Sequence, residues 1–161
     1  MKKYSSNKNI WWFFFVFGIL VFLILVIPPD NLDTVIGALI FLVLVWIIGF
    51  IIVNFTYATL NDGRLFYTNQ LIFRQKVDVI KIISISYLPT WKIQQEKICS
   101  FFIHYEQGLL GKMEFKNSVF SEKTLGELAH DLKHANPHIT LDAKATKLMR
   151  EYEQSLMKEK S

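Results

Sequence analysis

Two long runs without a charged residue lie near the start of the chain, and they constrain its folding more than any other feature. The first run covers Ile10 to Ile27, and the second covers Thr34 to Phe55. A helix of about 20 residues is as long as a bilayer core is thick, roughly 30 Å. Prolines and acidic residues between the runs are typical of a turn. The sequence therefore predicts a membrane hairpin over residues 10–55, with transmembrane helices over about 10–27 and 34–55.

A cleaved signal peptide and a pair of buried helices are the alternative interpretations of these runs. Lys2, Lys3 and Lys8 resemble the positive start of a signal peptide, but no small-residue cleavage pattern follows. Two uncharged runs of this length also exceed what a domain of this size could cover. Basic residues flank both runs and only acids lie between them, so the positive-inside rule places both termini in the cytoplasm. The prediction is a multi-pass protein of a bacterial cell membrane, with residues 1–9 as a cytoplasmic N-terminal tail.

The residues from Thr56 onward have the mixture of charged and apolar side chains that is ordinary for a small globular domain. β-branched and aromatic residues form short runs between turn signals, of which Asn61-Asp62-Gly63 is the clearest. The segment from Leu88 to Glu96 fits either a loop or one short irregular strand. The remaining runs predict strands over Tyr57–Leu60, Arg64–Thr68, Leu71–Lys76, Val77–Tyr87, Ile98–Tyr105 and Leu109–Lys116.

Two amphipathic helices are predicted after the strands. Ser121 is a typical helix N-cap, with Phe120 and Leu125 at the positions of a hydrophobic staple, and Pro137 ends that helix. Apolar residues at helical spacing indicate a last helix within residues 141–161. The fold class is therefore a membrane α-helical hairpin plus an α+β domain: an antiparallel barrel or sandwich of six or seven strands, a capping helix and one additional terminal helix.

Four segments carry a resemblance to a known family: residues 57–65 in the first hairpin, the strand entry over residues 77–85, the segment Phe101–Gly108, and the close formed by residues 124–128, Leu132 and Asn136-Pro137-His138-Ile139. With two preceding membrane helices, this order resembles the bacterial pleckstrin-homology-like (PH-like) domain proteins. The resemblance implies a PH-like domain over residues 56–140 and specifies no ligand. Eukaryotic relatives of this fold hold phosphoinositides with clustered Lys and Arg, whereas the corresponding loop here has only Arg64.

Six residues are candidates for contact with lipid or with a partner. Basic residues at one strand end, and a Trp-Lys pair in the segment after Leu88, could touch anionic lipid head groups. The apolar stripe of the last helix could pack on its own domain or on a partner. These candidates are Arg74, Lys76, Trp91, Lys92, Leu148 and Tyr152.

No catalytic, cofactor or metal site is predicted. His130, His134 and His138 have spacings that could bring two imidazoles to one metal. No cysteine completes the set, and no well-placed carboxylate does so apart from Glu127 or Asp131, while the polar helix face favours ordinary solvent exposure. Cys99 has no nucleophile motif around it, and the chain has no glycine-rich phosphate loop. A net charge of +4, with acids interleaved among the bases, predicts no nucleic-acid partner.

The predicted function is that of a non-catalytic, membrane-anchored binding module at the cytoplasmic face. The bilayer would anchor it, and it would engage another membrane protein or itself as a homo-oligomer, with tethering raising the local concentration. Recognition of anionic lipid head groups is the first alternative. An enzyme acting on lipid or envelope precursors is the second.

Overall fold

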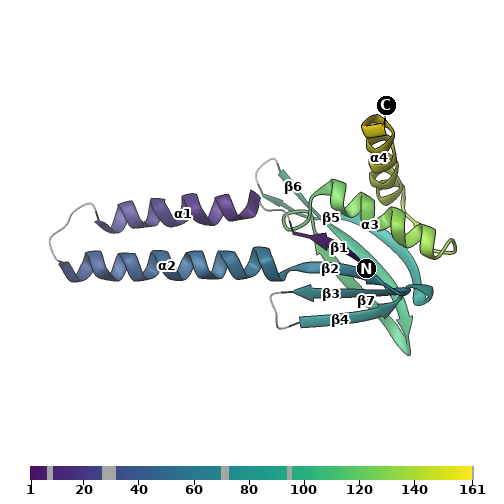
Figure 1. Ribbon diagram of the computed structural model, residues 1–161, viewed down its shortest axis with the longest axis horizontal. Coiled ribbons are helices and arrows are strands. Elements are labelled where there is room, and N and C mark those ends of the chain that lie inside the picture. The colour runs from purple at the N-terminus through teal and green to yellow at the C-terminus, as the bar shows by residue number, and fades with distance from the viewer. Residues whose placement is uncertain (7–8, 27–31, 70–72, 94–95, 161) are drawn as a thin grey trace.

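A pair of helices projects from one end of a β-rich domain in the computed structural model, which describes residues 1–6, 9–26, 32–69, 73–93 and 96–160 (Figure 1). Two further helices and a 3-10 turn complete the fold. The helical elements are α1 (Asn9–Val26), α2 (Leu32–Phe55), η1 (Val79–Lys81), α3 (Glu122–Ala135) and α4 (Ala143–Lys160). The strands are β1 (Lys2–Ser5), β2 (Tyr57–Asn61), β3 (Arg64–Asn69), β4 (Phe73–Asp78), β5 (Ile82–Ile93), β6 (Glu96–Gln107), β7 (Leu109–Lys116) and β8 (Thr140–Leu141).

The strands form two four-stranded sheets, in the orders β1-β2-β3-β4 and β7-β6-β5-β8. The predicted hairpin at Asn61-Asp62-Gly63 is confirmed, because β2 and β3 pair antiparallel on either side of it. Asp62 and Gly63 have positive φ angles of 48° and 70°, the conformation that two-residue hairpin turns require. Glycine and aspartate adopt this conformation more readily than other residues, which explains the position of the turn.

The first sheet contains a strand that the sequence analysis did not predict. Residues Lys2–Ser5 form β1 and pair antiparallel with β2, with Tyr4 opposite Ala58. Tyr4 is only 2% exposed, so its ring is part of the core. A four-residue strand with two lysines lacks the alternation that predicts a strand, and its partner lies more than 50 residues away in the sequence.

The second sheet contains most of the segment from Leu88 to Glu96, for which the sequence fitted either a loop or a short strand. Residues 82–93 form one long strand, β5, whose register against β6 shifts between Pro89 and Trp91. The predicted run Val77–Tyr87 is divided by η1, which turns the chain from the first sheet into the second. The short strand β8 pairs parallel with β5, and this pairing was not predicted either.

The core lies between the two sheets and is closed by α3. Its largest fully buried side chains include Phe101, Phe115, Leu125 and Leu128. The predicted N-cap of α3 is confirmed, because the Ser121 hydroxyl accepts a hydrogen bond from the Thr124 backbone N–H at 3.1 Å. The amphipathic face of α3 therefore covers the core as its sequence pattern predicts.

The last helix, α4, packs against α3 and β5. A Cβ atom at Gly126 on α3 would lie 2.5 Å from the carbonyl oxygen of Leu148, so glycine permits the close approach of the two helices. Asp142 fixes the start of α4, because its carboxylate accepts hydrogen bonds from the backbone N–H groups of Tyr87 and Ala145. The last helix thus packs on its own domain.

The predicted fold class is wrong in its membrane hairpin. The two uncharged runs do form α1 and α2, but no helix in the described parts of the chain is long and apolar enough to cross a membrane. The same finding contradicts the predicted multi-pass membrane protein with cytoplasmic termini.

The predicted number of strands is also wrong. Six or seven strands in one barrel or sandwich were expected, whereas the structure has two sheets of four strands each. The difference arises because Lys2–Ser5 and Thr140–Leu141 each add a short edge strand. Both additions depend on long-range pairing, which local sequence patterns do not reveal.

Candidate interaction surfaces

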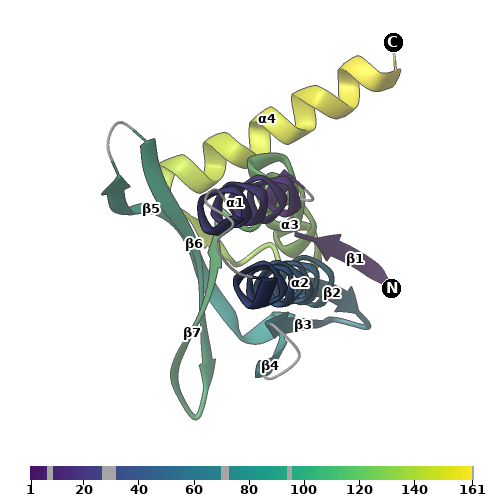
Figure 2. The same cartoon turned by 90° about the vertical axis from the view of Figure 1, so that its left-hand side faces the viewer.

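The α1–α2 pair has one internal seam of apolar contacts. The rings of Phe15 and Trp46 stack with their centroids 5.2 Å apart. At Gly18 an added Cβ atom would lie 2.9 Å from the Leu42 side chain and 3.2 Å from the Trp46 indole nitrogen. Ala38 on α2 is 3% exposed. Small residues therefore let the two helices approach closely. In both views α1 and α2 lie side by side (Figures 1 and 2).

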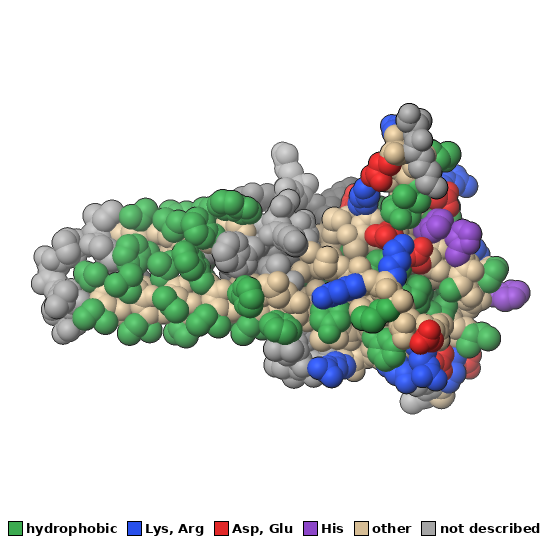
Figure 3. All heavy atoms as spheres, viewed as in Figure 1, with side chains coloured by type: hydrophobic (Ala, Val, Ile, Leu, Met, Phe, Trp, Pro, Cys, Tyr) green, Lys and Arg blue, Asp and Glu red, His purple; other side chains and the backbone are tan. Residues whose placement is uncertain are grey.

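The outward sides of the pair are covered with large apolar side chains. Among the described residues, Figure 3 shows no charged side chain on the visible face of the pair, whereas charged side chains of both signs lie on the β domain and α4. The most exposed apolar side chains are about half accessible to the surroundings. They include Trp12, Val16, Leu20, Ile40, Val43, Leu44, Ile47, Ile48 and Phe50. A contiguous apolar surface of this kind marks an interaction site.

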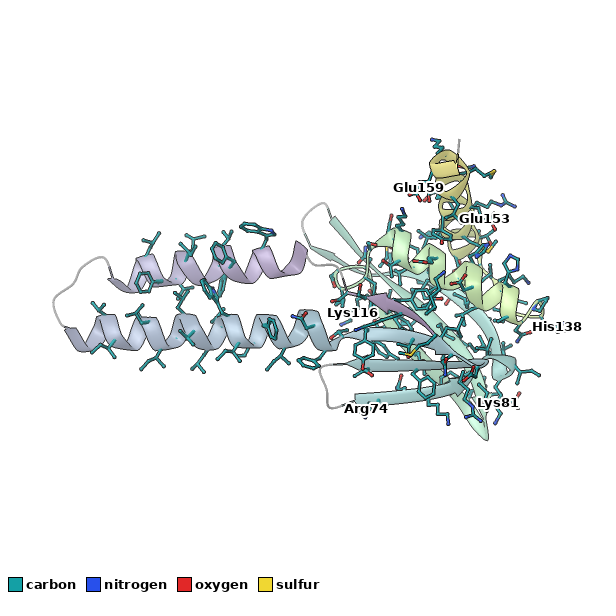
Figure 4. All side chains as sticks on the ribbon, viewed as in Figure 1. Arg74, Lys81, Lys116, His138, Glu153 and Glu159 are labelled. Carbon is teal, nitrogen blue, oxygen red and sulfur yellow. The ribbon has the colours of Figure 1, made fainter. Side chains whose placement is uncertain are left out.

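The two basic residues predicted at a strand end lie on β4 at an edge of the first sheet. Arg74 and Lys76 are both exposed, and Figure 4 places Arg74 at the end of β4 nearer the helix pair. Alternate residues of the sheet, such as Leu65 and Val77, are buried in the core, so Arg74 and Lys76 lie on the outer face. The structure thus brings these two candidates together.

Lys3 joins these two residues from the opposite edge of the same sheet. Its ammonium lies 4.4 Å from the ring centroid of Tyr57, and that of Lys76 lies 5.7 Å from the ring of Phe66. We call Lys3, Tyr57, Phe66, Arg74 and Lys76 the basic face. Sequence reasoning missed Lys3 because only the pairing of β1 with β2 brings it to this sheet.

The other four predicted contact residues are not part of the basic face. Trp91 and Lys92 belong to β5, but their side chains lie outside the described part of the structure. Leu148 and Tyr152 are buried at 6% and 8% exposure, and their region of α4 lies against Gly126 of α3. In this arrangement the apolar stripe of α4 is used by the domain itself.

A network of ionised and polar side chains ties β1 to α3. The Lys2 ammonium contacts Glu127 at 2.8 Å and also pairs with Asp131, which accepts a hydrogen bond from the Tyr4 hydroxyl. Partial burial alone would lower the pKa of Lys2, but its hydrogen bonds to both carboxylates raise that pKa to about 12. Burial opposes ionisation of Asp131, yet hydrogen bonds from Lys2, Tyr4 and His130 hold its pKa below the usual value.

We expect this network to make the stability of the protein fall at low pH. The folded-state pKa of the Asp131 carboxyl lies below the reference value of 3.8. Its stabilising contribution is therefore complete above that reference value and is lost as the pH falls through the lower folded value. Thermal midpoints of the wild type and of Asp131→Asn, measured from pH 7 down to pH 3, should draw closer once the pH falls below 3.8. A constant difference between them across this range would contradict the assignment.

Two of the three histidines considered for a metal site, His130 and His134, line a groove between α3 and α4. The rings of His130 and His134 are 4.5 Å apart, and the groove of about 190 Å³ is also lined by Glu153. His130 Nδ1 lies 3.2 Å from Asp131, which orients that ring. Among the residues that the structure describes, no group of three or more His, Cys, Asp or Glu side chains is arranged to hold a metal ion.

Comparisons with known proteins returned no match to a protein-family model, to a characterised protein or to a solved structure. The resemblance to the bacterial PH-like proteins therefore stays a prediction. The interaction surfaces must be interpreted from their own chemistry.

Proposed function

We propose that this protein is a non-catalytic binding module whose α1–α2 pair inserts into an apolar surface of a partner protein or of a second copy. The observation that carries this proposal is the array of half-exposed apolar side chains on the pair. The β domain leaves that array uncovered and supports it at one end, where α2 continues into β2 after Thr56 alone.

The size of the array supports a binding role. Full burial of one Leu, Ile, Val or Phe side chain contributes about 1.5–3 kcal/mol of favourable free energy. Covering a side chain that is already half buried therefore contributes about 1 kcal/mol to the free energy of association. Association itself costs on the order of 4–15 kcal/mol. An interface that covers most of the pair offsets that cost, whereas two or three scattered side chains would not. The proposed partner therefore contacts both sides of the pair along much of its length.

The β domain is suited to hold this element rather than to perform chemistry. Its core cluster is made of apolar side chains, and the polar groups described above serve helix caps and strand docking. Tyr87 lines a groove, and its hydroxyl donates a hydrogen bond to Glu122 at 2.8 Å. Burial raises the pKa of Tyr87 most, and this hydrogen bond raises it further. A tyrosine that holds its proton more tightly is a poor candidate for a general base.

Introducing two carboxylates on the exposed side of α2 is expected to weaken association by roughly 100-fold or more, because burying an unpaired charge costs several kcal/mol. The variant is Ile40→Glu with Leu44→Glu, at positions 58% and 52% exposed. Sedimentation velocity of the full chain should show the wild type in an assembly and this variant as a monomer.

The matched control carries the same change of charge on the β domain, as Ile80→Glu with Leu110→Glu. These side chains are 83% and 80% exposed and lie away from the helix pair, so the control should sediment like the wild type. A wild type that sediments as a monomer would contradict association with a second copy, and an assembly that contains lipid and only one protein chain would contradict the proposal as a whole.

A further inference from the structure

The basic face places cations at both edges of one sheet with aromatic rings between them. Backbone pairing aligns Lys3, Thr59, Phe66 and Lys76 in one row across the four strands. The neighbouring row ends at Arg74. Neither row contains an acidic residue, because the second consists of Ser5, Tyr57, Thr68 and Arg74.

Two cations of the basic face lie over aromatic rings of the same sheet, but none of the three is neutralised by a described acidic side chain. The next row of the same sheet holds Arg64, whose guanidinium Nε lies 3.1 Å from Asp78, and that aspartate also faces Lys81. In contrast, Lys3, Arg74 and Lys76 have no ion pair with any described residue. Their positive charge is therefore available to a ligand.

Protection of the sheet edges accounts for part of this pattern. Lysines on edge strands prevent edge-to-edge pairing with other molecules. That role is served by a charge of either sign, and it does not require three cations and two rings on one outer face. The uniform sign of the charge points to an anionic ligand as well.

The dimensions of the basic face fit an extended peptide. Lys3 and Lys76 lie on the first and fourth strands of the sheet. Three strand spacings of roughly 4.8 Å separate them by about 14 Å. An extended chain rises by roughly 3.3 Å per residue, so a segment of four or five residues crosses that distance. Arg74 lies at the end of the sheet nearer the helix pair (Figure 4).

We propose that the basic face binds an extended acidic segment of the partner protein, beside the apolar element that covers the helix pair. This inference rests on the binding role proposed above and defines the chemistry of the partner. Glutamate or aspartate side chains would pair with Lys3, Arg74 and Lys76, while the chain lies across Tyr57 and Phe66. Pairing of opposite charges across an interface mainly gives specificity and speeds association.

The test uses the full chain and a fluorescein-labelled peptide of eight glutamates, with fluorescence anisotropy as the readout. We expect the wild type to bind the peptide at low salt and to lose affinity as salt is added, because exposed ion pairs are screened. The variant Lys3→Glu, Arg74→Glu, Lys76→Glu should bind at least tenfold more weakly. The control Lys144→Glu, Lys147→Glu, Arg150→Glu carries the same change of charge on exposed positions of α4 and should retain wild-type affinity.

Three outcomes would overturn the inference. The wild type could fail to bind the peptide, the two triple variants could lose affinity equally, or the wild type could bind phosphatidylserine vesicles through the basic face and ignore the peptide. Circular dichroism and the thermal midpoint establish that each variant is folded. The variant Ile40→Glu with Leu44→Glu should still bind the peptide, so failure of the helix-pair proposal and failure of this one give different results.

Discussion

Replacing Phe115 by alanine is expected to lower the free energy of unfolding by about 3–5 kcal/mol, because the substitution leaves a cavity in the core. Phe115 is 0% exposed. Its ring centroid lies 4.5 Å from that of Tyr67 on β3, 6.3 Å from that of Phe101 on β6 and 5.4 Å from that of Phe120. One side chain therefore connects both sheets with the start of α3.

Urea denaturation and thermal melting measure this effect. For a chain of this size the midpoint should fall by roughly 10 °C. Phe115→Leu, which fills most of the cavity, should recover most of the loss. Leu110→Ala on the same strand is the control, because Leu110 is 80% exposed and its truncation should change stability by less than about 0.5 kcal/mol. Equal effects at positions 110 and 115 would show that the two sheets are not joined at Phe115.

Replacing Asn136 by alanine is expected to cost about 2–4 kcal/mol, because several buried backbone groups lose their partners. Asn136 is 7% exposed and follows α3. Its side-chain amide donates to the carbonyl oxygens of Val79 at 3.1 Å and Ile82 at 3.3 Å, and its oxygen accepts from the His138 N–H at 3.1 Å. The side chain thus links the end of α3 to η1, where the chain passes between the sheets.

The variant Asn136→Asp isolates the donor role. The carboxylate keeps the shape of the amide and can still accept from His138, but it cannot donate to the two carbonyl oxygens. We expect it to be at least as destabilising as alanine in urea denaturation at pH 7, because a charge is then buried against carbonyl dipoles. If Asn136→Asp retained wild-type stability, the hydrogen bonds to η1 would not contribute.

Local chemistry was sufficient to predict several elements of this fold. Asp62 and Gly63 define a turn by their backbone preferences, and Ser121 defines the start of α3 by the geometry of its cap. Each of these signals acts within a few residues, so the sequence contains them in full. The uncharged runs likewise predicted that α1 and α2 are helices, although the predicted membrane around them is not supported.

The missed strands β1 and β8 depend on contacts between distant segments. β1 forms because Tyr4 enters the core beside Ala58 and because Lys2 reaches Asp131 on α3. For the same reason the basic face was only half predicted: Arg74 and Lys76 were recognised, while Lys3 belongs to it through strand pairing alone. The membrane prediction is contradicted because no helix in the described part of the chain is long and apolar enough to cross a membrane.

The central claim is that a protein surface covers the α1–α2 pair in the cell. A photo-crosslinking amino acid placed at position 43, on the exposed side of α2, tests it most directly, with position 80 on η1 as the control. We expect irradiation of living cells to join position 43 to a protein, a second copy or a distinct chain, and to give no such product at position 80. Products that contain only lipid, or equal protein crosslinking from both positions, would contradict the claim.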